Sequence, residues 1–337
     1  MSVRVAICED SRAYAQALKM FLETDGDLEV VGIAARGEDL LGDLSRLRPD
    51  LVTMDLELPG IDGVETIRRI MTARPTPAVV ISGHVGSDAR AVAAALDAGA
   101  LEAIRKSDLR LDERGTPRAG AVRRRLARLA TSAVGSRRTS QRSDAGVPVI
   151  PPTATVIGIG ASTGGPRALR TVLGALPGDF PLPVLVVQHM APGFTAGLAT
   201  WLNDVVDLPV RLASEAEPLG PGVLIAPDDA HLLVTPQGRV RLDRRTPGNP
   251  HRPSVDMLLR SLAEASKRRA IGVVLTGMGA DGAAGVEALL EAGGTAVTER
   301  AGDATLWAMP AAAADAGAGV LDLEAIGPAL AAAAGRR

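Results

Sequence analysis

Short apolar runs alternate with stretches of helical periodicity along this 337-residue chain, and this alternation limits its possible folds more than any other feature. In the first part, helical patterns such as RAYAQALKMFLET and VETIRRIMTAR separate the apolar runs. Strands that alternate with helices form βαβ units, because parallel neighbours need a long crossover connection. The sequence therefore predicts an α/β fold built on parallel sheets. The first strands are expected at 3–8, 28–34, 51–54 and 78–82, with a weaker one in LEAIR.

The alternation is interrupted once, and the interruption predicts two domains. Residues 126–152 contain TSAVGSRRTSQRSDAGVP, which has no hydrophobic periodicity and is typical of a flexible linker. We therefore expect one domain over 1–125 and another over 153–337. In the second, βα alternation starts again at TATVIGIGAS, and it predicts a doubly wound, mostly parallel sheet. Closely spaced apolar runs between 218 and 245 predict an antiparallel hairpin within that scheme.

Composition excludes several classes of protein. The formal net charge is -2 and aromatic residues make up 2% of the chain, so we expect no nucleic acid as a partner. No apolar run reaches the roughly 18 residues of a membrane span, and MSVRVAICED lacks the pattern of a signal peptide. We therefore expect a cytoplasmic protein with no direct membrane insertion. The single cysteine, Cys8, allows no intramolecular disulfide and is expected to be buried.

Charged and hydroxyl side chains follow the predicted strands of the first domain at their carboxyl ends, where functional groups of parallel sheets gather. Three carboxylates in one pocket repel each other unless a cation neutralises them, and Mg²⁺ prefers such oxygen ligands. We expect Asp55 to attack a phosphoryl group as a carboxylate nucleophile. A lysine and a hydroxyl can contact the phosphoryl oxygens. The metal ligands would be Glu9, Asp10 and Asp55, and the phosphoryl contacts Ser82 and Lys106.

This first domain resembles the receiver domain of two-component response regulators. The segments ICED, VTMDLELPGIDGVE, VISG and IRKS match the family's acidic pair, phosphoacceptor, hydroxyl and lysine positions. The resemblance implies a flavodoxin-like fold and phosphorylation of Asp55 by a partner histidine kinase, with Mg²⁺ bound. Ala103 and Ser107 stand where the family usually has an aromatic residue and a proline.

The second domain opens with VIGIGASTGGPRAL, an apolar strand followed by a glycine-rich turn and the start of a helix. A dinucleotide-binding turn needs G-x-G-x-x-G; Gly158 and Gly160 fit, but Thr163 stands at the third glycine. A nucleophile elbow needs G-x-S-x-G, and GASTG, centred on Ser162, fits it fully. The turn therefore favours a serine nucleophile, with a phosphate-binding turn as the alternative.

A serine nucleophile needs a base and an orienting acid, and strand-end placement selects His189 and Asp281. His189 ends the apolar run PVLVVQ, and Asp281 lies in the glycine-rich turn after IGVVLTG. The order Ser, His, Asp differs from that of the α/β-hydrolase fold. Backbone N–H groups of the TGG and TGMG turns are candidate oxyanion donors. Loop and turn roles are expected instead for His231, His251, Asp228 and Asp229.

The same segments resemble the chemotaxis methylesterase family of the CheB type. The matching blocks are GASTGGP, QHMAPGFT, IAPDDAHLLV, HRPSVDMLLRSL, LTGMGADGAAG and WAMP. The resemblance implies hydrolysis of glutamate methyl esters on methyl-accepting chemoreceptors, and deamidation of receptor glutamines, with no cofactor in this domain. Ser162, His189 and Asp281 fall on catalytic positions, and the backbone N–H groups of Thr163 and Met278 on oxyanion positions. The alternative is a response regulator with a nucleotide-binding or DNA-binding output domain.

Overall fold

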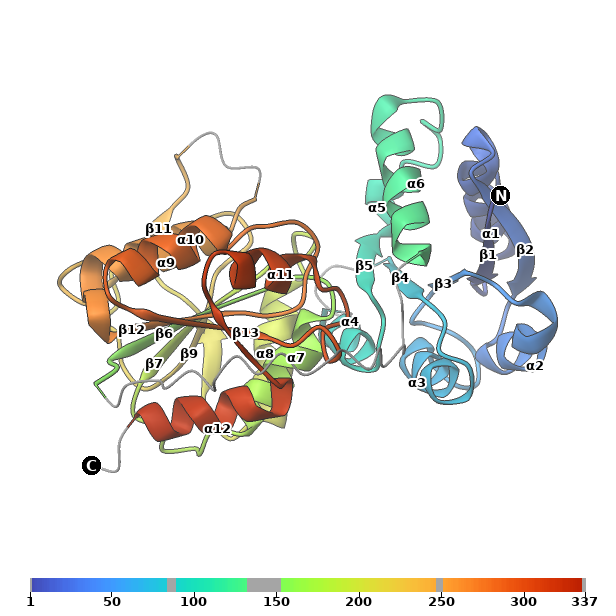
Figure 1. Cartoon of the computed structure of the whole chain (residues 1–337). Helices are drawn as coiled ribbons and strands as arrows, with labels where there is room; N and C mark the ends of the chain where they lie inside the picture. Colours follow the sequence, from blue (N-terminus) through green and yellow to red (C-terminus); the bar gives the residue numbers. More distant parts are fainter. Residues whose placement is uncertain (1, 84–88, 132–152, 247–250, 335–337) are drawn as a thin grey trace. The chain divides into compact units, whose positions relative to one another are not determined.

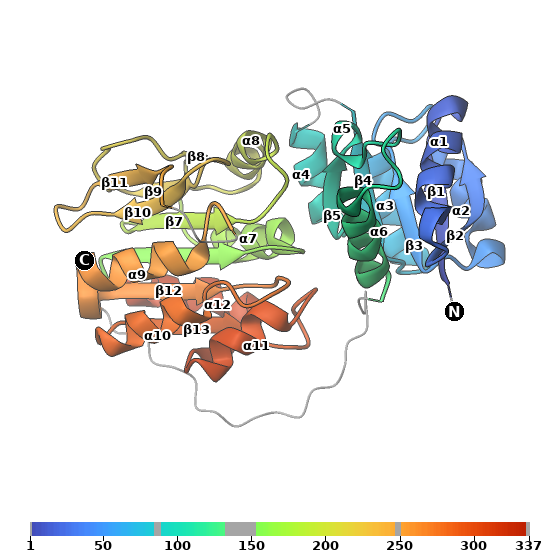
Figure 2. The same ribbon diagram turned by 90° about the horizontal axis from the view of Figure 1, so that it is seen from above.

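The computed structural model describes residues 2–83, 89–131, 153–246 and 251–334. The chain divides into two compact units, Met1–Ser136 and Arg137–Arg337, drawn in Figures 1 and 2. Of the predicted linker at 126–152, residues 132–152 lie outside the described residues. None of the helices in the described part of the chain combines the length and the hydropathy that a membrane span requires.

The first unit is a five-stranded parallel sheet in the order β2-β1-β3-β4-β5. Helices α1 and α6 cover one face of it, and α2, α3 and α4 the other (Figure 1). This arrangement confirms the predicted flavodoxin-like fold. The strands are β1 (Val3–Cys8), β2 (Leu28–Ala34), β3 (Leu51–Met54), β4 (Ala78–Ser82) and β5 (Glu102–Arg105). The helices are α1 (Arg12–Leu22), η1 (Glu23–Asp25), α2 (Gly37–Leu47), α3 (Gly63–Ala73), α4 (Ala89–Asp97), α5 (Lys106–Leu109) and α6 (Pro117–Ala130).

Helix α6 begins with a side-chain cap, because the Thr116 hydroxyl accepts a hydrogen bond from the backbone N–H of Ala119. It continues to Ala130, past the boundary that the sequence predicted at residue 125. Two buried side chains, Leu126 and Leu129, keep this last part of the helix against the sheet. The hydrophobic spacing of the helix, rather than the onset of polar residues, therefore sets its end.

The second unit holds a seven-stranded sheet in the order β14-β13-β12-β6-β7-β9-β8, with every pair of strands parallel. Helices α9, α10 and α11 lie on one face, and α7, α8 and α12 on the other (Figure 1). The strands are β6 (Val156–Ala161), β7 (Pro183–Gln188), β8 (Val210–Leu212), β9 (Gly222–Ile225), β12 (Ala270–Val274), β13 (Thr295–Glu299) and β14 (Gly319–Leu321). The helices are α7 (Gly165–Gly174), α8 (Thr195–Val205), α9 (Val255–Ser266), η2 (Lys267–Arg269), α10 (Ala283–Glu291), α11 (Ala308–Asp315) and α12 (Leu323–Ala333).

A separate antiparallel pair, β10 (His231–Val234) and β11 (Val240–Asp243), confirms the predicted hairpin. The large sheet is doubly wound about its middle. From β6 the sheet grows in one direction through β7 and β9, and in the other through β12 and β13. In such sheets the crevice outside the carboxyl ends of the strands, where the order reverses, is the usual place for a ligand. The carboxyl ends of β6, β7 and β12 are therefore where a site is expected.

Candidate active site and acidic cluster

Ser162 follows β6 directly, and its backbone is held from three sides. Its N–H donates to the carbonyl of Thr276, at 2.9 Å, in the turn after β12. Its carbonyl accepts from the N–H of Gly165, at 2.8 Å, and from Nε2 of Gln188, at 2.7 Å. Contacts to both neighbouring strands thus fix where the serine leaves the sheet.

His189 leaves the neighbouring strand at the same level as Ser162. Strands β6 and β7 pair Ala161 with Gln188, and the N–H of His189 donates to the Ala161 carbonyl at 2.9 Å. Because neighbouring strands lie about 4.8 Å apart, this register puts the serine and the histidine side by side at one edge of the sheet. Nε2 of His189 lies 2.9 Å from Oδ2 of Asp281, so the structure brings the predicted base and acid together.

Asp281 lies at the N-terminus of α9, and its carboxylate is almost fully enclosed. It accepts hydrogen bonds from the Ser254 hydroxyl at 2.9 Å and from the backbone N–H groups of Val255 and Asp256, at 2.8 and 3.0 Å. Burial opposes ionisation, but the His189 ring and these N–H groups outweigh it and lower the pKa of Asp281 from 3.8 to about 2. The start of a helix also favours a negative charge. Asp281 is therefore an ionised carboxylate over the whole physiological pH range.

The two glycine-rich turns meet at Ser162. A Cβ added to Gly277 would lie 2.7 Å from Cβ of Ser162, so only glycine lets the β12 turn come this close. The Gly277 N–H is occupied, since it donates to the Leu306 carbonyl at 3.1 Å. Within the described residues, the N–H groups of Thr163 and Met278 have no acceptor. These two N–H groups are thus available for a ligand next to Ser162.

The glycines that suggested a dinucleotide fingerprint have a packing role. A Cβ on Gly158 would lie 2.6 Å from the Leu262 side chain, and one on Gly160 would lie 2.2 Å from that of Val255. Both contacts come from α9, which packs directly on β6 at these positions. The G-x-G pattern therefore allows close approach of a helix to the strand, and the phosphate-binding alternative loses its main support.

Several residues that contact the three predicted site residues were missed by sequence reasoning. His251 stacks on His189, with ring centroids 4.6 Å apart and an interplanar angle of 12°. Gln188 and Thr276 carry buried polar side chains at strand ends, which is the signal that could have found them. His231 was expected in a loop, but it opens strand β10 and is fully buried. Asp228 lies in a turn, as expected, and its carboxylate also accepts from the N–H of Gly193 at 2.7 Å, 35 residues earlier in the chain.

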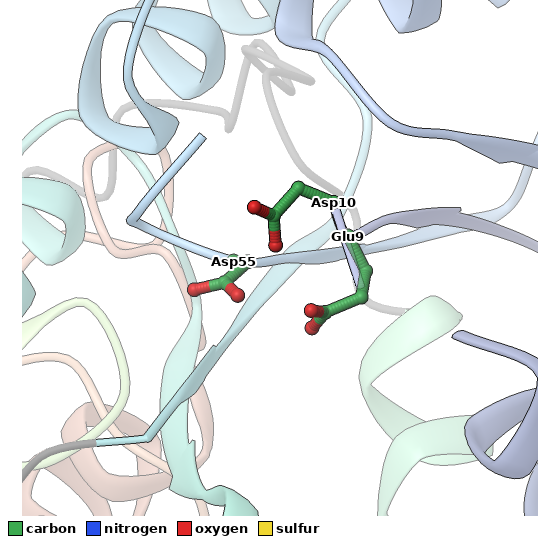
Figure 3. Close-up of side chains that lie close together, drawn as sticks. All are labelled: Glu9, Asp10 and Asp55. Atoms are coloured by element: carbon green, nitrogen blue, oxygen red, sulfur yellow. The ribbon is translucent and has the colours of Figure 1, made fainter. Parts of the chain in front are cut away.

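In the first unit, the acidic side chains converge as predicted. One ligand atom from each of Glu9, Asp10 and Asp55 lies within 4.8 Å of the others, and Figure 3 shows the three carboxyl groups pointing into a common space. Glu9 and Asp55 are buried and Asp10 is exposed. Ser82, at the end of β4, is also buried. The chemistry and spacing of these oxygens fit a hard cation such as Mg²⁺.

Lys106 lies within this acidic cluster. Its ammonium is 2.8 Å from Oε2 of Glu9 and 2.6 Å from Oδ2 of Asp55. Burial works against the charge of Lys106, but the two carboxylates outweigh it and raise the pKa of the lysine. Burial raises the pKa of Glu9, with a further increase from Asp55 that opposes the effect of the lysine. Tyr14, which sequence reasoning missed, lies under the ammonium at 4.5 Å from its ring centroid.

Comparison with known families bears on both units. Residues 157–330 match the family described as CheB methylesterase, and residues 5–111 match the response regulator receiver domain. A protein-glutamate methylesterase/protein-glutamine glutaminase 4 of Myxococcus xanthus is 41% identical, over 91% of this chain and 90% of its own length. The chain belongs to the CheB methylesterase family. A relative from Symbiobacterium thermophilum, named protein-glutamate methylesterase/protein-glutamine glutaminase, is 37% identical over 99% of this chain and 97% of its own length.

A solved structure agrees with the family assignment. The crystal structure of the Thermotoga maritima CheB methylesterase catalytic domain matches 53% of this chain and 98% of its own, with 40% identity and a TM-score of 0.51. The CheB and receiver matches together support the methylesterase interpretation of the sequence. They give no support to an output domain that binds nucleotides or DNA.

Proposed function

We propose that this chain hydrolyses glutamate methyl esters on methyl-accepting chemoreceptors, and deamidates receptor glutamines, with Ser162 as nucleophile, His189 as base and Asp281 as orienting acid. The observation that carries the proposal is the 2.9 Å contact between His189 and Asp281. His189 follows β7, the strand that pairs with β6, and Ser162 follows β6. A base held by an ionised carboxylate, beside a serine at a strand end, is the arrangement that serine hydrolysis needs.

The contact of His189 with Asp281 supports one assignment of the two ring nitrogens. We assign the proton of the neutral ring to Nε2 of His189, which lies 2.9 Å from Oδ2 of Asp281, and we assign acceptance of the serine proton to Nδ1. The Ser162 oxygen then attacks the ester carbonyl. The imidazolium returns the proton to the departing methoxy group, and methanol leaves an acyl-enzyme. Water, deprotonated by the same nitrogen, releases the free glutamate and restores the serine.

The N–H groups of Thr163 and Met278, which have no acceptor in the described part of the chain, support a role in binding the oxygen that becomes negative during this attack. Loss of one such donor typically raises the barrier by about 3 to 4 kcal/mol. A glutamine side chain follows the same course, with ammonia as the leaving group. The reaction needs protonation of the leaving nitrogen, which the imidazolium also supplies.

For the first unit we propose phosphorylation of Asp55 by a histidine kinase of the chemotaxis type, as a control on the hydrolytic unit. Magnesium bound by Glu9, Asp10 and Asp55 would supply the positive charge that holds a phosphoryl group against the Asp55 carboxylate. Lys106, already 2.6 Å from Asp55, supports contact with a phosphoryl oxygen, and the Ser82 hydroxyl with another.

A labelling experiment on the full chain tests the proposed nucleophile. A fluorophosphonate probe should label wild-type protein at Ser162, as located by peptide mass spectrometry, and the Ser162→Ala variant should stay unlabelled. Ser214, an exposed serine in the same unit, provides the matched control, since Ser214→Ala should label like wild type. Methanol release from a methylated receptor fragment should follow the same order. Labelling at another serine, or full methanol release by Ser162→Ala, would refute the assignment.

A further inference from the structure

Glu299, the last residue of β13, lies next to the turn after β12, whose Thr276 carbonyl binds the Ser162 N–H. Glu299 has no part in the chemistry above. Strands β12 and β13 pair Val274 with Thr298, so Glu299 stands level with Leu275, one residue before Thr276. The glutamate is 0% exposed. A fully buried carboxyl group at the carboxyl end of the sheet, among the strand ends that build the active site, calls for a role.

One carboxyl oxygen of Glu299 is joined to the nucleophile through a single residue. Its Oε1 accepts the backbone N–H of Thr276. The carbonyl of Thr276 accepts the Ser162 N–H at 2.9 Å, and its hydroxyl donates to the Thr163 carbonyl at 2.9 Å. The same hydroxyl accepts from the Leu306 N–H at 2.8 Å. Glu299 therefore holds Thr276 in place, and Thr276 in turn holds the backbone of Ser162.

The other oxygen, Oε2, is buried and has no hydrogen-bond partner among the residues that the structure describes. An ionised carboxylate with one such oxygen is costly, whereas a protonated carboxyl group places no net charge there. Neighbouring segments offer Glu299 little positive charge. Arg300 lies 2.5 Å from Asp322, after β14, and Asp281 in the β12 turn is in contact with His189. Asp303, in the loop after β13, adds a negative charge.

We propose that Glu299 is a positioning residue for Ser162, held as a neutral carboxylic acid, and that its ionisation in alkaline solution displaces Thr276 and slows hydrolysis. A negative charge in this enclosure must either reach water or gain a counter-ion, and each requires the end of β13 or the 300–306 loop to move. Because Thr276 is bonded to both Glu299 and Ser162, that movement disturbs the nucleophile. Burial raises the pKa of Glu299 to about 8, against the effect of the Thr276 N–H and with a further increase from Asp303.

The inference rests on the proposed esterase function, and a pH profile of the full chain tests it. Methanol release is measured from pH 6 to 9.5 for wild type, E299Q, E299A and E291Q. Glu291 is exposed, so E291Q is the matched control and should follow wild type. Wild-type activity should fall about tenfold from pH 7 to pH 9, because the neutral fraction of an acid with a pKa near 8 falls by that factor.

E299Q keeps the oxygen acceptor without a titrating proton. It should stay within about twofold of wild type at pH 7 and show no decline. E299A should lose activity at every pH. An alkaline decline in E299Q equal to that of wild type would overturn the proposal.

A stability measurement keeps this inference separate from the esterase function. The folded pKa of Glu299 is raised above its usual 4.5, so its protonated form stabilises the fold below that pH, and the effect is lost as the pH rises toward 8. The relevant thermal transition is the one whose midpoint E299A shifts. In that transition, the melting temperature of wild type should fall relative to that of E299Q between pH 5 and pH 8. Absence of methanol release in all variants would refute the proposed function alone. A difference between wild type and E299Q that is constant with pH would refute the role of Glu299 alone.

Discussion

Asp256 and Asp281 cap two adjacent helices reciprocally: Asp281 binds the start of α9, and Asp256 binds the start of α10. The Asp281 carboxylate accepts the N–H groups of Val255 and Asp256 at the start of α9. Oδ1 of Asp256 accepts the N–H groups of Gly282, at 2.9 Å, and Gly285, at 2.7 Å, at the start of α10. Each aspartate thus satisfies backbone donors beside the other, and the pair fixes the turn that presents Asp281 to the histidine.

The reciprocal capping predicts that the Asp256 carboxylate contributes to the stability of the fold. Asp256→Ala leaves two N–H groups at the start of α10 without an acceptor and should lower the free energy of unfolding by about 2 kcal/mol, measured by urea denaturation. Asp256→Asn keeps an oxygen acceptor and should lose less. Asp315→Ala, at an exposed aspartate of α11, is the control and should change little. Equal losses in the alanine and asparagine variants would contradict the capping role.

The proposed triad predicts non-additive losses. Ser162→Ala and His189→Ala should each lower kcat for methanol release by about 10⁴-fold or more, because groups that act as a unit fail together. The double variant should therefore be little worse than either single one. Asp281→Asn, which preserves most of the cap at α9, should lose less than the other two. If the single losses multiplied in the double variant, the two residues would be acting independently.

The acidic cluster predicts metal-dependent phosphorylation of Asp55. Incubation with a small-molecule phosphodonor should add one phosphoryl group to the wild-type chain when Mg²⁺ is present, and none in EDTA, as read by intact-mass spectrometry. Asp55→Asn should remain unmodified. Asp27→Asn, at an exposed aspartate of the same unit, is the matched control and should be phosphorylated like wild type. Equal modification with and without the metal would rule out the proposed role of the cluster.

The main elements near the sites follow from the sequence because parallel, buried strands leave continuous apolar runs. The expected strands at 3–8, 28–34, 51–54 and 78–82 match β1, β2, β3 and β4. Strand-end logic then brings Ser162 and His189 together, because the side chains after parallel strands share one edge. The Asp281 turn follows from the same logic, since β12 pairs directly with β6.

What the sequence could not show depends on contacts between distant segments. Gly158 and Gly160 look like part of a phosphate-binding turn until α9, about a hundred residues later, is seen to occupy the space. Ser254 looks like an ordinary helix cap, although its hydroxyl donates to Asp281. Glu299 looks like a polar residue at the end of a strand, and only its enclosure shows that its charge is unfavourable. Burial of polar groups is a tertiary property, and local periodicity does not record it.

The last prediction concerns acid stability and follows from Asp281. Its folded pKa, about 2, is lower than the ordinary value of 3.8, so its ionised form stabilises the fold at neutral pH. By linkage, this contribution is fully present above pH 3.8 and is lost as the pH falls toward 2. The shift corresponds to roughly 2 kcal/mol in the free energy of unfolding, since one pKa unit is about 1.4 kcal/mol.

The difference in the free energy of unfolding between wild type and Asp281→Asn, measured by urea denaturation, should therefore be constant from pH 7 to about pH 5 and shrink below pH 4. Asp315→Asn serves as the control and should show no such change. A difference that did not shrink in acid would mean that Asp281 stabilises the fold through packing, and that the helix start and His189 do not hold its charge.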